Sequence, residues 1–433
     1  FWGAFEYLAG RSTVRNAGHL VDPSMGVLPQ YGADRIQQRT QFYELAYYYR
    51  WRPETASLVY YAHRNYPVRF NSTMTVLLPG FAWNQYFSQT YDLESHNIQL
   101  QQHQQFTWLG RHNLIAGFDY YTVPRVSQRR QASDPFSATG FDYQSPQRNY
   151  SFYLVDYWRP LKNLVVEMRL VKDLFKGVRF GYQENIHRSW WSPSFGLSYQ
   201  FAVGSSWHVL SGAAGRSLNT HLIAQALLLP SLVAGFPWVL DTQVGAEMRQ
   251  AGAAWEAQWD RRTFTVLRLQ ALRIATPTYC PAVPGVPAPV CQTWRRYLAS
   301  LIVNRILTDS LGLSAGVMGK RVLVDRSYED NGLKSLSEIN AFLGLAYLHR
   351  QGWLARLKPL LIQQYGNNPG RQADNPAIVV NLTLGREFPR KRGFALVEVQ
   401  NLFNRRPFFA LEPYRDLELA NQRRFLVRVG LYF

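Results

Sequence analysis

The connections between the strand-like segments of this chain alternate between short and long along its whole length. The short connections have three to five residues and lie at 52–55, 109–112, 159–162, 203–206, 259–262, 308–310, 350–352 and 389–393. The long ones lie near 11–38, 71–91, 127–147, 175–191, 217–240, 277–291, 326–336, 366–376 and 407–422. A sheet with every long connection at one end is typical of the up-and-down barrels of the bacterial outer membrane, which have short periplasmic turns and long surface loops.

Most segments between these connections alternate apolar and polar residues with a period of two, as half-buried strands do. The stretch SFGLSYQF at 194–201 alternates large apolar residues with serine, glycine and glutamine, and IQLQQHQQFTW at 98–108 carries one entirely polar face. The predicted fold is therefore all-β: a transmembrane antiparallel up-and-down β-barrel of about 18 strands, within a range of about 16 to 22. We expect residues 1–433 to form this single outer-membrane domain.

A sheet in hydrocarbon has to close, because each unpaired backbone N–H or C=O group there costs several kcal/mol. A barrel of this size encloses a lumen that wall side chains do not fill. Water, a plug, folded-in loops or a partner protein must therefore occupy it.

The composition favours strands over helices as the membrane-spanning elements. Aromatic residues make up 15% of the chain, yet the mean hydropathy is −0.24. No apolar run reaches the roughly twenty residues of a transmembrane helix. The nearest candidate, 222–240, is interrupted by Pro230, Gly235 and Pro237. We expect the connection 217–240 to contain local helix and to fold over or into the mouth of the barrel as a lid.

The two cysteines, Cys280 and Cys291, bracket a charge-free stretch rich in proline, glycine and valine. This spacing predicts a disulfide that closes the 277–291 loop outside the cell, where the compartment is oxidising. Two unrelated free thiols are the alternative. A metal site is not expected, because no His, Asp or Glu lies beside them.

No sequence motif indicates an enzyme, a cofactor or a metal site. The chain lacks GxSxG, HExxH and GxxxxGK[ST], and its nine histidines are dispersed. The formal net charge of +18 raises nucleic acid as a partner, but no basic helix or RNA-binding motif accompanies it. We predict a protein that is not an enzyme and does not bind nucleic acid.

The basic excess instead predicts a lumen that favours anionic or polyhydroxylated solutes, because strand charges facing lipid cost about 2–4 kcal/mol each. The lumen-lining candidates are Arg50, Gln99, Gln101, His103, Gln105, Arg169, Arg268, Gln270, Glu398, Arg424 and Arg428. The alternative is that Glu44, Glu167, Glu387 and Glu398 pair with these arginines and merely stabilise the wall. Arg129, Arg130 and Arg371 are candidates for contacts with lipopolysaccharide phosphates at the outer rim.

The stretch RRFLVRVGLYF at 423–433 has an apolar face and a back that carries arginines. We expect the apolar face to meet lipid and the strand to pair with the first one, near 1–8. A terminal aromatic residue preceded by apolar residues at steps of two is similar to the signal read by the barrel assembly machinery. The residues of this signal are Phe425, Val427, Val429, Leu431 and Phe433.

Three stretches resemble the barrel of TonB-dependent outer-membrane receptors of Gram-negative bacteria. They are 151–173 (SFYLVDYWRPLKNLVVEMRLVKD), 191–218 (beginning WSPSFGLSYQF) and 397–409 (VEVQNLFNRRPFF) with the final strand. The resemblance covers roughly residues 150–260 and 375–433 and implies an outer-membrane location. The chain departs from the family in showing no plug domain and no TonB box. It begins at Phe1 without a leader, as a processed chain or a fragment would.

The function predicted from these features is transport: a receptor-like or porin-like conduit with a basic lumen lined by arginine and glutamine. The alternative is a membrane-embedded scaffold barrel that holds a plug, a lipoprotein or a surface filament. The expected partners are outer-membrane lipid and lipopolysaccharide, the barrel assembly machinery, and a plug, periplasmic or lumen-filling protein. Neither the substrate nor the direction of transport follows from the sequence.

Overall fold

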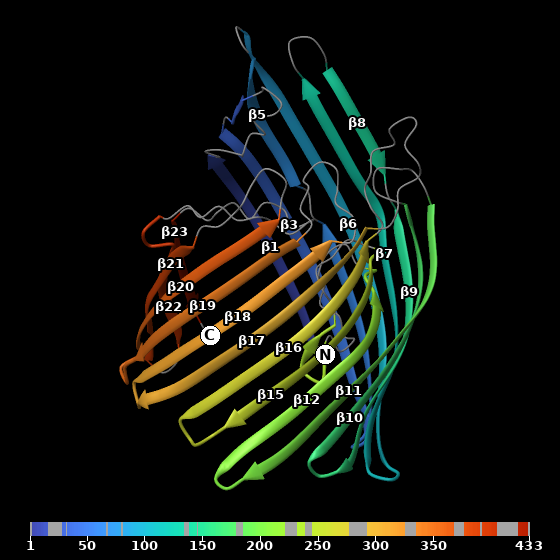
Figure 1. Cartoon of the computed structure of the whole chain (residues 1–433). Coiled ribbons are helices and arrows are strands. Elements are labelled where there is room, and N and C mark those ends of the chain that lie inside the picture. The colour runs from blue at the N-terminus through green and yellow to red at the C-terminus, as the bar shows by residue number, and fades with distance from the viewer. Residues whose placement is uncertain are drawn as a thin grey trace.

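The computed structural model describes residues 2–15, 28–31, 33–65, 68–78, 81–133, 138–144, 146–178, 185–220, 232–238, 245–276, 292–324, 335–367, 376–389, 392–404 and 423–431. Every labelled element within these ranges is a β-strand (Figure 1). Among the described residues, no helix is long and apolar enough to span a membrane.

The strands fall into a main series and five short or accessory ones. The main series is β1 (Trp2–Arg15), β3 (Ala33–Arg52), β4 (Thr55–Asn65), β6 (Phe81–Thr107), β7 (Arg111–Ser133), β9 (Gln147–Leu161), β10 (Leu164–Val178), β11 (Asn185–Val203), β12 (Ser206–Leu218), β15 (Glu247–Gln258), β16 (Thr263–Thr276), β17 (Gln292–Thr308), β18 (Leu311–Val324), β19 (Ser335–Leu348), β20 (Trp353–Asn367), β21 (Ala377–Glu387), β22 (Gly393–Gln400) and β23 (Arg424–Leu431). The others are β2 (Leu28–Tyr31), β5 (Val68–Leu78), β8 (Ala138–Gln144), β13 (Leu232–Val233) and β14 (Phe236–Pro237).

All strands except β13 and β14 belong to one 21-stranded sheet, which curves round on itself (Figure 1). Seventeen antiparallel pairings join the main series in chain order from β1 to β23. The predicted all-β, up-and-down architecture is thereby confirmed. Within the described residues β23 pairs only with β22, so the predicted pairing of the last strand with the first is not among the observed ones.

The short turns are tight because their own side chains satisfy the backbone. In the β15–β16 turn the Arg262 N–H donates to Asp260 Oδ1 over 2.6 Å, and the Thr263 hydroxyl donates to Asp260 Oδ2 over 3.2 Å. The Trp259 N–H closes the turn onto the Thr263 carbonyl oxygen at 3.0 Å. The Arg262 N–H holds the pKa of Asp260 below its ordinary value.

Two of the predicted long loops are largely strand. The stretch 71–91 contributes to β5 and to the start of β6, and 127–147 contributes to the end of β7 and to β8. Backbone pairing continues along both hairpins, which rise above the rest of the sheet (Figure 1). The predicted long connections are therefore present at these two places, but most of their residues are paired as extended hairpins.

The two faces of the sheet are inverted relative to a soluble protein. Large apolar side chains such as Leu45, Leu100, Phe152 and Leu357 are more than 40% exposed, whereas many buried side chains are polar. Hydrocarbon is the solvent that such an apolar outside fits. We call the face with the buried polar residues the inward face, and the face with the exposed apolar residues the outward face.

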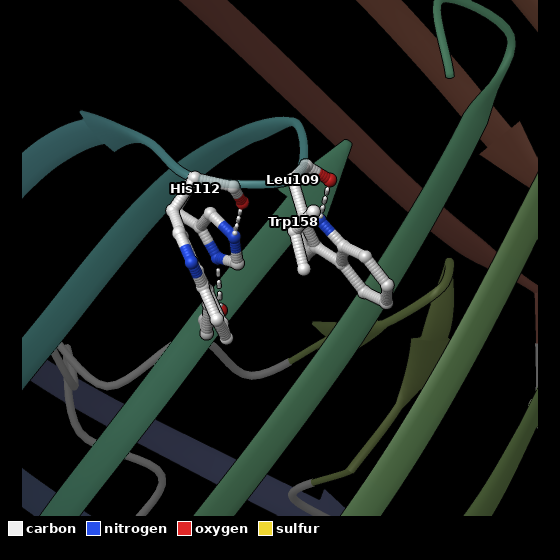
Figure 2. Close-up of polar contacts among 5 residues, drawn as sticks. Leu109, His112 and Trp158 are labelled. Carbon is white, nitrogen blue, oxygen red and sulfur yellow. Dashed lines mark hydrogen bonds and ion pairs between the residues drawn. The ribbon is translucent and has the colours of Figure 1, made fainter. Parts of the chain in front are cut away.

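Aromatic belts on the outward face mark the end of the membrane band beside the short turns. His112 is held at 2.7 Å by Asp156 and at 2.8 Å by the Trp108 carbonyl oxygen, and Phe106 stacks on its ring. Figure 2 shows His112 and Trp158 beside the turn, with the Trp158 indole N–H donating to the Leu109 carbonyl oxygen at 3.0 Å. A second belt groups His208 with Trp255 and Trp259. Aromatic girdles of this kind lie at membrane–water interfaces.

The described part of 217–240 is not helical. Strands β13 and β14 form a small hairpin, whose turn residues Ala234 and Gly235 have positive φ angles of 47° and 84°. The prediction of local helix is therefore wrong for 232–238. The same hairpin belongs to the connection 217–240, which was predicted to fold over or into the mouth of the barrel. Cys280 and Cys291 lie outside the described residues.

Candidate functional site

Buried polar side chains line the inward face of β6, β7, β9 and β10. They recur at every second position because alternate residues of a strand point to the same side. We call this set the polar wall. Its members are Ser95, Asn97, Gln99, Gln101, Asp119, Asn149, Ser151, Arg169 and Asp173, each at most 6% exposed. Hydrogen-bonding groups are thus concentrated in one sector of the inward face.

The polar wall is tied together across strands. The Asn149 amide donates to Ser151 Oγ at 2.6 Å, and the Ser151 hydroxyl donates to Asp173 Oδ1 at 2.5 Å. Arg169 lies between Glu167 and Asp173 on the same face of β10, and both carboxylates attract its guanidinium. A buried cation with two nearby carboxylates is held rigidly, since any member left alone would be an uncompensated buried charge.

The hairpin β13–β14 packs against the inward face beside the polar wall. Val233, Phe236 and Trp238 are at most 3% exposed and form one apolar cluster with Ala213 of β12 and Ala254 of β15. Polar contacts fix the hairpin as well. The Ala234 N–H donates to Glu167 Oε2 at 3.0 Å, and the Gln250 amide donates to the Pro237 carbonyl oxygen at 2.8 Å. The connection between β12 and β15 therefore reaches into the space that the sheet surrounds.

Two glycines make room for this hairpin. A Cβ atom on Gly252 would lie 2.5 Å from the Phe236 ring, and one on Gly196 would lie 2.9 Å from both Val233 and Ala234. Real Cβ contacts are not that short, so any larger residue at either position would push the hairpin away. Because Gly196 and Gly252 have no side chains, the inward face has room for the hairpin at these two positions.

A second polar group lies on the inward face of β18, β19 and β20. Lys320 Nζ is 3.1 Å from Glu338 Oε2, and the Gln364 amide donates to the same oxygen at 2.6 Å. The Asn340 amide donates to Glu338 Oε1 at 2.7 Å. This arrangement neutralises the carboxylate of Glu338 and makes this part of the inward face polar.

The structure puts the predicted lumen residues in different settings. Gln99, Gln101 and Arg169 are buried in the polar wall, and His103 is hydrogen-bonded to Gln101 at 2.8 Å. Arg50 is exposed and donates to the Pro53 carbonyl oxygen at 2.9 Å. Gln105 is exposed, Gln270 lies 3.5 Å from Gln250, and the side chain of Arg424 is not described.

Two of the predicted arginines are paired with glutamates. Arg268 lies 3.4 Å from Glu256, and Arg428 lies 3.6 Å from Glu398. These contacts match the wall-stabilising alternative for those residues. Of the assembly-signal residues, Phe425, Val427 and Val429 are more than 60% exposed, the side chain of Leu431 is not described, and Phe433 lies outside the described residues.

Sequence reasoning missed the acidic part of the site. Asp119 and Asp173, which were not among the predicted residues, are buried on the inward face together with Glu167, which was predicted as a partner of an arginine, and Asp173 and Glu167 both attract Arg169. The signal was present in the alternation, because each of these carboxylates shares its strand face with other polar residues. The net charge of +18 is a property of the whole chain and does not show this local group of carboxylates.

The comparisons with known proteins agree with this architecture. The family model described as "TonB dependent receptor-like, beta-barrel" matches residues 3–252. A search of curated protein sequences found no match.

Solved structures of outer-membrane receptors share the fold, and three of them serve as examples. The ferric citrate transporter FecA in its unliganded form has a TM-score of 0.62 and 13% identity, over 92% of this chain and 62% of that one. BauA, the ferric preacinetobactin receptor from Acinetobacter baumannii, has a TM-score of 0.62 and 12% identity, over 92% and 63%. The ferric-catecholate import receptor Fiu from K12 E. coli has a TM-score of 0.60 and 11% identity, over 92% and 65%. The chain spans less than two thirds of the length of these receptors.

Proposed function

We propose that this chain, which belongs to the TonB-dependent receptor-like β-barrel family, forms the conduit of an outer-membrane transporter whose lumen is gated by the hairpin β13–β14. Members of this family are bacterial outer-membrane receptors and transporters rather than enzymes. The observation that carries the proposal is the docking of the hairpin onto the inward face through Glu167, Gln250 and an apolar cluster. A ligand that competes for these contacts would release the hairpin.

The substrate class that we propose is an anionic or polyhydroxylated solute, of which an iron chelate is one chemical type. Support comes from the polar character of the inward face, which includes Gln99, Gln101, Gln364 and the ion pair of Lys320 with Glu338. The solved structures of similar fold are named for ferric citrate, ferric preacinetobactin and ferric-catecholate ligands. Amides and cations on a confined wall favour solutes rich in oxygen acceptors.

Exchanging Arg268 and Arg428 for glutamine should lower the preference of the conduit for anions. Each arginine faces one glutamate, so its removal leaves a carboxylate uncompensated. We expect the anion-to-cation permeability ratio to fall by about two- to threefold, since the local potential of a pore wall sets ion selectivity. Reversal potentials in planar bilayers, with urea present to release the hairpin, measure this ratio.

The matched control removes the glutamate as well. Arg268→Gln combined with Glu256→Gln changes no net charge and should leave the ratio near that of the wild type. An unchanged ratio in Arg268→Gln and Arg428→Gln would contradict the assignment of these residues to a conducting lumen. Absence of any conductance, together with a stoichiometric protein that co-purifies in the lumen, would favour a scaffold barrel instead.

The predicted contact with lipopolysaccharide also belongs to this proposal, at a site other than the predicted one. Arg216, Arg249, Arg273 and Arg295 are directly opposite one another across β12, β15, β16 and β17. Arg273 and Arg295 share a strand face with the exposed Leu269 and Tyr297, and Arg216 lies 5.1 Å over the ring of Trp190. Like charges at directly opposed positions destabilise a sheet, unless an anion lies between them. We call these four residues the arginine row.

The position of the arginine row fits the outer edge of the membrane. Ten residues of strand separate Arg249 from Trp259 in the aromatic belt. At about 3.4 Å per residue and a tilt of about 40°, this corresponds to a height of roughly 26 Å, close to the thickness of the apolar band. On the periplasmic side of the row, a groove of about 710 Å³ is lined by the small residues Ala251, Ala271 and Ala299 and also by Lys320 and Glu338. One amphipathic lipid could therefore bind with its phosphates at the arginine row and its acyl chains in the groove.

Removing two rungs of the arginine row should release that lipid. Arg249→Gln with Arg273→Gln is expected to weaken binding of a phosphorylated glycolipid by about thirtyfold, at about 1 kcal/mol for each basic residue near an anionic surface. Native mass spectrometry of the detergent-solubilised protein counts bound lipid. Arg268→Gln, on the inward face of β16, is the control and should retain it; equal retention by the row variant would refute the site.

Two further partners belong to the proposal. Assembly through the barrel assembly machinery accords with the exposed apolar face of β23. A plug or periplasmic protein is the partner that the family resemblance implies. The Cys280–Cys291 disulfide and the single-domain organisation of 1–433 stay predictions.

A further inference from the structure

Two histidines face each other across β4 and β6 on the outward face. His63 and His96 are directly paired in the register of the two strands. Their Nδ1 atoms are 3.3 Å apart, and their ring centroids are 4.6 Å apart. Their neighbours on this face, Val59, Tyr61 and Ile98, are exposed apolar residues.

Two side-chain oxygen atoms, from Tyr61 and Glu94, lie close to His96 of this pair. The Tyr61 hydroxyl lies 3.1 Å from His96 Nδ1, and Glu94 Oε1 lies 3.3 Å from His96 Nε2. One donor atom from each of His63, Glu94 and His96 falls within 4.8 Å of the others. The four side chains come from two neighbouring strands, so the backbone ladder fixes their spacing.

We propose that His63, His96 and Glu94 form a binding site for a divalent transition-metal ion on the outside of the barrel. Two nitrogens bound to one tetrahedral zinc ion at about 2.05 Å are about 3.3 Å apart, which is the separation of the two Nδ1 atoms here. Nitrogen donors favour zinc, copper or nickel over calcium and magnesium, which take oxygen ligands. The site is independent of the lumen and of the transport proposal.

Glu94 has two ways to serve the ion. At its present position the carboxylate lies 3.3 Å from His96 Nε2, on the far side of the ring from the Nδ1 atom that is 3.3 Å from His63 Nδ1. A carboxylate that orients a metal-binding histidine in this way also makes the ligand nitrogen more basic. A rotation of the Glu94 side chain would instead make it a third ligand, with Tyr61 or water as the fourth.

The site of His63, His96 and Glu94 lies near the outer border of the membrane, where a bound cation would lower the cost of the carboxylate. His63 lies eight residues along β4 from Thr55 at the short turn. This distance corresponds to about 27 Å of strand and roughly 20 Å of height, near the outer border of the apolar band. The side chains of His96 and Glu94 are 30% and 45% exposed, so an ion can reach them from the external side. A carboxylate and two imidazoles beside lipid are costly, and a shared cation offsets the charge of the carboxylate.

The test uses Cu²⁺ and Zn²⁺ with the purified full chain in detergent. Electron paramagnetic resonance with electron spin echo modulation should report one Cu²⁺ per chain bound by two imidazoles. His63→Asn with His96→Asn should lower affinity at least about a hundredfold, and Glu94→Gln should lower it about ten- to a hundredfold. His103→Asn, on the opposite face of β6, is the matched control and should bind as the wild type does.

A second measurement does not depend on the variants folding. In the wild-type chain, Zn²⁺ should protect His63 and His96 from diethylpyrocarbonate and leave His103 reactive, as peptide mass spectrometry would show. Equal modification of all three histidines with and without Zn²⁺ would overturn the proposal. A two-imidazole Cu²⁺ signal that persists in the double variant would overturn it too.

Discussion

Replacing Gly252 by leucine is expected to open the lumen and to raise single-channel conductance in planar bilayers severalfold. A Cβ atom at this position would lie 2.5 Å from the ring of Phe236, so a leucine side chain occupies the space where the hairpin now sits. Phe236 is 3% exposed, and losing the burial of such a side chain costs about 2–3 kcal/mol. The docked population should therefore fall by a factor of about 30 to 150 relative to the undocked one.

Gly319 provides the matched control for this experiment. It lies in β18, and a Cβ atom there would meet nothing within 4 Å. Gly319→Leu should therefore assemble equally well and keep the conductance of the wild type. If Gly252→Leu is assembled but conducts no more than Gly319→Leu, the hairpin does not gate the lumen. A conductance increase in both variants would point to a general loosening of the sheet instead.

Replacing Arg169 by methionine should destabilise the barrel more than any other single change in the wall. Arg169 is 6% exposed, and its guanidinium lies among the carboxylates of Glu167 and Asp173. Removing the cation leaves two buried carboxylates without compensation, which costs about 3–5 kcal/mol. The urea concentration at the unfolding midpoint, followed by tryptophan fluorescence or by heat-modifiable gel mobility, should fall accordingly.

Two further variants separate this electrostatic cause from a loss of packing. Arg169→Met combined with Asp173→Asn and Glu167→Gln removes the charges together, and it should recover most of the lost stability. Arg268→Gln removes an arginine that is about half exposed, and the expected cost is within about 1 kcal/mol. An Arg169→Met protein as stable as Arg268→Gln would show that the buried charges are not coupled.

The arrangement of strands was predictable because it follows from local rules. A short turn such as 259–262 forces its two strands to be antiparallel neighbours, and the period-2 pattern of 194–201 selects which side chains meet lipid. Neither inference needs knowledge of distant contacts. The same rules located the long connections 71–91 and 127–147 but not their hairpin pairing, since that depends on which backbone segments lie opposite one another.

The candidate site was predictable only in part. The glutamines at alternate positions in 98–105 predicted a polar inward face, and Gln99 and Gln101 are buried on that face. The contact of Arg268 with Glu256 depends on strand register, which puts Arg268 opposite Ala254, two residues from Glu256. The hairpin at Val233–Phe236 carries no sequence signal for its docking place, because glycine at 196 and 252 signals nothing until the hairpin contacts it.

The sequence by itself determined the class of the fold, the membrane environment and the up-and-down order of the strands. Each of these depends on residues close together in the chain and on the cost of unpaired backbone groups in hydrocarbon. Only the tertiary structure decided which charges are neutralised, where the β12–β15 connection docks, and that His63 lies against His96. Such contacts join residues far apart in sequence, and their energies depend on register and on burial, which sequence spacing does not contain.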